Sequence, residues 1–148
     1  MDAYQLSRHE KNKMNRSFKY EVDMTRLFFE ELRKQFADED IYYKVGNHDV
    51  RFDKYIMDNA DQLNGLITLE DVLRLREHRV KLVGSMTKVI AGKLNILHGH
   101  ELPVKGALNH ARAVMSKVSS NVLMGHFHRS DRSYMRDLDC DVHAVFGT

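Results

Sequence analysis

The chain has 148 residues, of which 43% are hydrophobic and 30% are charged, and its formal net charge is +2. This composition is typical of one globular domain, and so small a net charge gives no argument for nucleic-acid binding by the whole chain. No apolar stretch of about 18 residues and no signal-peptide pattern is present, so we expect no membrane segment and no secretion. The single cysteine, Cys140, cannot form an internal disulfide, which favours a cytoplasmic protein.

The first 17 residues are polar and lack a clear period, so we expect a loop with one helical turn. Positive charge gathers between Arg8 and Lys19 and forms a basic arm. Such arms can contact phosphates, although a solvated basic surface is their commoner role.

An amphipathic helix is predicted from Phe18 to about Ala37-Asp38. We expect its apolar stripe to face the core: Tyr20, Met24, Leu27, Phe28, Leu32 and Phe36. A strand follows at Ile41–Val45, and residues 50–59 can be helical.

The middle of the chain is predicted to combine a short helix with strands. Thr68 can cap a helix that runs to about Arg76. A β-branched strand follows, and then two strands that are expected to form a hairpin: Val80–Val83, Thr87–Ile90 and Leu94–Leu97. The remaining predicted elements are a helix opened by Pro103, a strand at Asn121–Met124 and β structure from Ser133 to Thr148.

Three of these predicted strands end in a turn that carries glycine and histidine. The turns are Gly46-Asn47-His48-Asp49, His98-Gly99-His100 and Gly125-His126-Phe127-His128. The first presents an amide, an imidazole and a carboxylate together. Because ligand sites of open α/β sheets lie outside the carboxyl ends of strands, the three turns are expected to converge on one metal site.

The side chains in these turns suit transition metals. Imidazole nitrogens favour zinc, iron, manganese or nickel, and an amide oxygen suits harder ions, so the mixed set favours a pair of metal ions. In an extended segment, His126 and His128 would point to the same side and address one centre. His48 is placed to donate a proton to a leaving oxygen while a metal-bound hydroxide attacks. The other histidines are expected to be surface or structural residues: His9, His78, His110 and His143.

The three turns resemble the last three signature blocks of the calcineurin-like metallophosphoesterases. The family has five such blocks, in the order Asp-x-His, Gly-Asp-x-x-Asp, Gly-Asn-His-Asp/Glu, a lone His and Gly-His-x-His. The resemblance implies an α/β fold, a β-sandwich flanked by helices, and two divalent transition-metal ions such as Mn²⁺, Fe²⁺ or Zn²⁺. It implies that Asn47, His98 and His126 ligate one ion and His128 the other. His48 would be the leaving-group acid or a phosphate contact, and His100 would lie behind the ligands.

The sequence departs from the family pattern upstream of Asn47, where no Asp-x-His block and no complete Gly-Asp-x-x-Asp block occur. The start, Met1-Asp2-Ala3-Tyr4, resembles the tail of the second block. In the family, the acid at the position of Asp2 orients the catalytic histidine, here His48. The bridging aspartate and two ligands of the first metal would then be missing.

The resemblance therefore implies a single but partial domain over residues 1–148, incomplete at its N-terminal end and ending early in its sheet. Met1 would be an internal methionine of a longer enzyme. Because a two-metal centre clamps both attacking and leaving oxygens, this chain alone is expected to bind metal weakly and hydrolyse poorly. A partner chain or an oligomer would cover the exposed sheet edge.

The leading hypothesis is a metal-dependent hydrolase of a phosphomonoester or phosphodiester, and the basic arm favours a nucleotide or nucleic acid as substrate. The alternative is a non-catalytic remnant or interaction module of the same fold, which the missing aspartates favour. A structural zinc protein is a third, weaker hypothesis, because a single cysteine cannot supply the usual thiolates.

Overall fold

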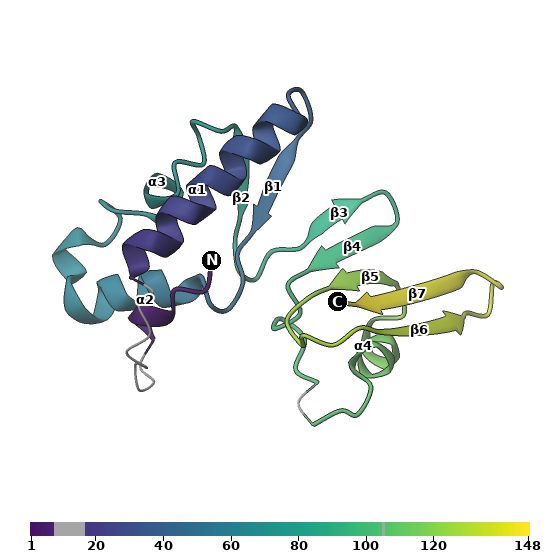
Figure 1. The fold of residues 1–148 in the computed structure, drawn as a ribbon. Helices are drawn as coiled ribbons and strands as arrows, with labels where there is room; N and C mark the ends of the chain where they lie inside the picture. The colour runs from purple at the N-terminus through teal and green to yellow at the C-terminus, as the bar shows by residue number, and fades with distance from the viewer. Residues whose placement is uncertain (8–16, 105) are drawn as a thin grey trace. The chain divides into compact units, whose positions relative to one another are not determined.

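The structure is a computed structural model that describes residues 1–7, 17–104 and 106–148. Most of the basic arm, residues 8–16, lies outside this described part. The chain forms two compact units, Met1–Leu82 and Val83–Thr148 (Figure 1). Helices and strands occur in both units, so the predicted α/β class is confirmed.

The first unit pairs two strands with a long helix and several short ones. Strands β1 and β2 form a two-stranded sheet (Figure 1). In chain order the elements are η1 (Tyr4–Leu6), α1 (Phe18–Gln35), β1 (Ile41–Lys44), α2 (Val50–Asn59), η2 (Asp61–Leu63), α3 (Leu69–Val72) and β2 (Val80–Val83). The predicted elements α1, β1, α2 and β2 are confirmed with ends that shift by three residues at most.

Helix α1 begins as its sequence predicts, but it buries another face. The Ser17 hydroxyl accepts the Tyr20 N–H at 3.1 Å and caps the first turn. The buried residues are Val22 and Phe29. Five of the six residues that were predicted to face the core are exposed: Tyr20, Met24, Leu27, Phe28 and Phe36. The prediction was wrong because apolar residues occupy more than one face of α1, so the periodicity alone could not choose between them.

Helix α3 is shorter than its sequence predicts. The Thr68 side chain accepts from the Asp71 N–H and the Asp71 carboxylate accepts from the Thr68 N–H, which makes a complete capping box. The helix ends at Val72 and not near Arg76, because Arg74 takes a left-handed conformation with φ of 52°. The turns that follow bury Leu73 and Leu75 in the core of this unit.

The second unit is a five-stranded sheet with one helix. The elements are β3 (Val89–Ala91), β4 (Leu94–Leu97), α4 (His110–Val118), β5 (Asn121–Met124), β6 (Asp131–Arg136) and β7 (Val142–Gly147). The strand order is β3-β4-β5-β7-β6, in which β4, β5 and β7 are parallel and the outer pairs are antiparallel (Figure 1). The predicted hairpin is present at β3-β4, and the β structure predicted near the C-terminus is a second hairpin, β6-β7.

Pro103 does not open a helix, which corrects the prediction. The helix begins at His110, where the Asn109 side chain accepts the Arg112 N–H at 2.7 Å and caps the first turn. Its buried residues, Ala111, Val114 and Met115, pack in one cluster with Val122, Met124 and Val145 of the sheet. The sequence between Pro103 and Asn109 contains apolar residues at helical spacing, but Leu108 is exposed and the cap lies after it.

Candidate metal centre and catalytic histidine

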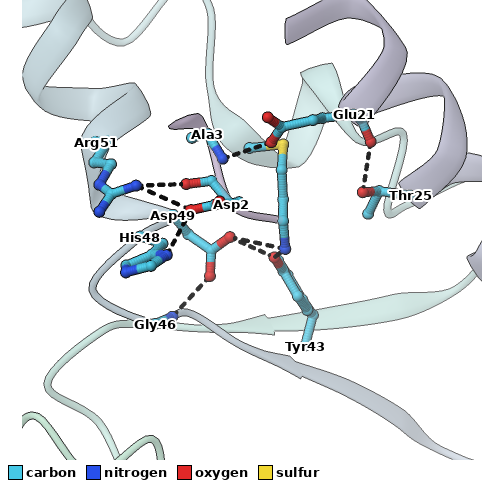
Figure 2. Close-up of polar contacts among 10 residues, drawn as sticks. Asp2, Ala3, Glu21, Thr25, Tyr43, Gly46, His48, Asp49 and Arg51 are labelled. Carbon is cyan, nitrogen blue, oxygen red and sulfur yellow. Dashed lines mark hydrogen bonds and ion pairs between the residues drawn. The ribbon is translucent and has the colours of Figure 1, made fainter. Parts of the chain in front are cut away.

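The turn after β1 places its three polar side chains differently. The Asp49 carboxylate is buried, and it accepts the Gly46 N–H at 2.8 Å and the Tyr43 hydroxyl at 2.6 Å (Figure 2). The Met1 ammonium lies 3.4 Å from the same carboxylate. Burial, and then the charge of Asp49, raise the pKa of Tyr43, so its hydroxyl stays protonated and donates. The sequence analysis expected this carboxylate to be presented with the amide and the imidazole, whereas it points inward and fixes the turn.

His48 forms an ion pair or hydrogen bond with Asp2. The Nδ1 atom of His48 lies 2.6 Å from Oδ1 of Asp2, and the Arg51 guanidinium lies 3.0 Å from the same oxygen (Figure 2). With Nδ1 held by a carboxylate, Nε2 is the nitrogen left to face a substrate. With 38% of its side chain exposed, His48 is accessible to solvent. The geometry agrees with the expected orientation of His48 by Asp2, and the role of either residue in catalysis stays a prediction.

In the second unit, two of the three histidines that were predicted to bind metal lie together at the carboxyl ends of neighbouring strands. Strands β4 and β5 are parallel and in register, with Leu97 opposite Met124. The next residues continue this pairing, because the Gly125 N–H donates to the His98 carbonyl at 3.0 Å. His98 and His126 therefore lie at the same edge of one sheet, with ring centroids 5.1 Å apart. Asn47, the fourth predicted ligand, belongs to the first unit.

His100 joins this pair of rings. Its centroid lies 5.1 Å from that of His98 and 6.0 Å from that of His126. His128 is exposed and, within the described part of the chain, makes no ring contact with the other three. The prediction that His126 and His128 point to one side assumed an extended segment. That assumption was wrong, because both residues have positive φ, 67° and 51°, and the backbone turns at each.

Glu101 is a buried acid that the sequence analysis missed. Its side chain is 8% exposed, and its carboxylate accepts the N–H groups of His98 at 3.1 Å and Gly99 at 2.6 Å. These two hydrogen bonds join the Glu101 side chain to the backbone where β4 ends, so Glu101 fixes the loop that carries His98 and His100. A signal was available in the sequence: an acid two to three residues after a glycine turn can bind the backbone of that turn.

Helix α4 supports the turn that carries His126 and His128. The His110 ring stacks on Phe127 with centroids 4.0 Å apart and an interplanar angle of 9°. Phe127 lies between His126 and His128 in the chain, so this contact holds the turn Gly125-His126-Phe127-His128 against α4. His110 was expected to be structural, and this packing agrees with that role.

Gly99 is required where the turn His98-Gly99-His100 lies close to the turn Gly125-His126-Phe127-His128. Its φ is +118°, and a Cβ there would lie 2.9 Å from His126 Cβ and 3.2 Å from the Gly125 carbonyl. We expect Gly99→Ala to destabilise the second unit by about 1–3 kcal/mol or more, from backbone strain together with this overlap. Urea unfolding measures the loss. Gly92→Ala is the matched control, because Gly92 also has positive φ (+60°) but a Cβ added there would meet no atom within 4 Å. Equal losses in the two variants would contradict the close approach.

Across residues 1–7, 17–104 and 106–148, no group of three His, Cys, Asp or Glu side chains is already arranged to hold a metal ion. The donor set near His98 and His126 nevertheless consists of imidazoles at one sheet edge, the chemistry that transition metals prefer. None of the described helices is long and apolar enough to cross a membrane. Comparison of the chain with protein-family models, with curated proteins and with solved structures finds no match.

Proposed function

We propose that the chain carries the site of a metal-dependent phosphoesterase of the calcineurin-like type, with the β-sandwich that this type implies. The observation that carries the proposal is the pair of histidine turns at the parallel ends of β4 and β5, with His98 and His126 5.1 Å apart. The carboxylate-paired His48 adds the acid that such a reaction needs. The substrate would be a phosphomonoester or phosphodiester, with a nucleotide or nucleic acid favoured by the basic arm.

The residues have distinct roles in this proposal. Asn47, His98, His126 and His128 would hold divalent transition metal, of which Mn²⁺, Fe²⁺ and Zn²⁺ fit the donors. A bound ion of this kind lowers the pKa of a coordinated water and polarises phosphoryl oxygens.

His48 would donate its Nε2 proton to the leaving oxygen. Asp2 would hold the Nδ1–H and stabilise the imidazolium before that transfer. Arg51 would keep the Asp2 carboxylate in place through the 3.0 Å contact.

Hydrolysis of bis-p-nitrophenyl phosphate in added Mn²⁺ tests the proposal. We expect turnover that a chelator abolishes, and a decrease of at least about 100-fold in His126→Ala, because even the loss of a residue behind a metal ligand costs about 10–100-fold. His143→Ala is the matched control: its imidazole bonds Asp137 at 2.8 Å in the β6–β7 hairpin and lies in none of the three turns.

Turnover that is independent of added metal, or equal in His126→Ala and the unaltered protein, would contradict the proposal. Stoichiometric metal binding without turnover would instead favour the alternative, a non-catalytic module of the same fold. The lack of an Asp-x-His block upstream of Asn47 is the observation that favours this alternative.

A further inference from the structure

The rings of His98, His100 and His126 form a compact triangle with centroid separations of 5.1, 5.1 and 6.0 Å. An imidazole nitrogen binds Zn²⁺ at about 2.0–2.1 Å, which places the ring centroid about 3.2 Å from the metal and two such centroids about 5.2 Å apart at a tetrahedral angle. Two of the three separations agree with this value, and the third, between His100 and His126, is longer at 6.0 Å.

The bonding of His100 leaves one of its nitrogens available. Its Nε2 lies 2.9 Å from the Ser85 hydroxyl oxygen, whereas its Nδ1 is buried and has no hydrogen-bond partner. A hydrogen bond from one imidazole nitrogen to a side chain is the usual support of a metal-binding histidine, because it fixes the tautomer and leaves the other nitrogen as the ligand. Ser85 can provide that support for His100.

Glu101 adds negative charge at the same place. Its buried carboxylate lies 3.5 Å from Nδ1 of His100 while it accepts the N–H groups of His98 and Gly99. The negative charge of this carboxylate attracts a cation bound at Nδ1 of His100. The local charge is therefore favourable for a positive ion.

We propose that His98, His100 and His126 together bind one divalent transition-metal ion, such as Zn²⁺ or Co²⁺, and leave a fourth position open. His100 is then a ligand, and the second unit holds this ion through its own residues. The rings must turn about their side-chain bonds to direct three nitrogens inward. Rotation about Cβ–Cγ leaves a ring centroid nearly in place, so the triangle survives it, and the broad torsional preference of that bond makes such a rotation accessible.

This inference rests on the proposed function only in sharing His98 and His126 with it, and metal binding tests it without any need for hydrolysis. The experiment is titration of the full chain with Co²⁺, followed by the visible absorption of tetrahedral Co²⁺ and by calorimetry. We compare His100→Phe with the unaltered protein. Phenylalanine keeps an aromatic ring in the space and removes both nitrogens, and thermal unfolding without metal checks that the variant folds.

We expect the affinity for Co²⁺ to fall by at least about 100-fold in His100→Phe, in His98→Ala and in His126→Ala. His143→Ala should retain the Co²⁺ affinity of the unaltered protein, because His143 lies outside the three turns and bonds Asp137. If His100→Phe keeps full affinity while His98→Ala loses it, the ligand role of His100 is wrong and the proposed function survives. If His98→Ala and His126→Ala also keep full affinity, both proposals are wrong.

Discussion

Replacement of His48 by asparagine is expected to reduce metal-dependent phosphodiester turnover by about 10²–10⁴-fold, the contribution that a positioned general acid makes. The Nδ1 of His48 lies 2.6 Å from Asp2, and an asparagine amide can keep that hydrogen bond while it removes the second ring nitrogen. Folding should therefore be preserved and proton donation lost. The measurement is kcat in Mn²⁺ for a phosphodiester with an alkoxide leaving group, compared with bis-p-nitrophenyl phosphate, with metal content determined on the same samples.

The matched control is His78→Asn, the same change at the other described histidine of the first unit. It should leave kcat unaltered. A leaving group of low pKa, such as p-nitrophenolate, needs less protonation than an alkoxide, so the effect of His48→Asn should increase with the pKa of the leaving group. A His48→Asn variant that keeps more than about a third of the turnover for every leaving group would rule out His48 as the acid.

Asp49→Ala is expected to destabilise the first unit by about 3–5 kcal/mol, because it leaves two buried donors without an acceptor. Those donors are the Gly46 N–H and the Tyr43 hydroxyl, at 2.8 and 2.6 Å from the carboxylate (Figure 2). Hydrogen exchange read by mass spectrometry should show faster exchange in β1 and α2, while the amides of β4 and β5 keep their protection.

Asp49→Asn separates hydrogen bonding from charge. Its amide oxygen can still accept the Gly46 N–H, and its NH₂ group can donate to the Tyr43 oxygen, so we expect a loss of only about 1 kcal/mol. Losses of equal size in Asp49→Asn and Asp49→Ala would show that the charge matters more than the two bonds. An unaltered exchange rate in both variants would contradict the structural role of Asp49.

Local rules predicted the half of the candidate site that lies in the second unit. The apolar runs at β4 and β5 and the glycines after them were enough to indicate two strand ends that carry histidines. The rule that parallel strands present ligands at their carboxyl ends then predicted that His98 and His126 meet. His100 was expected behind the ligands and Glu101 was not found, because the positions of both depend on how the loop folds back after β4.

The sequence by itself determined most of the element ends, since these depend on contacts between residues that are close in the chain. Ser17 and Thr68 cap their helices, and the strands of the two hairpins are separated by short turn sequences. Such signals act within a few residues, so they are readable without knowledge of the fold.

Only the tertiary structure decided which surfaces are buried. Helix α1 has apolar residues on several faces, and packing selected Val22 and Phe29 while it left Phe28 exposed. Asp49 resembles an exposed site residue in the sequence, but it is buried because Tyr43 and Gly46 offer it hydrogen bonds. Burial depends on partners that are remote in sequence or supplied by a particular loop conformation, and periodicity carries no information about either.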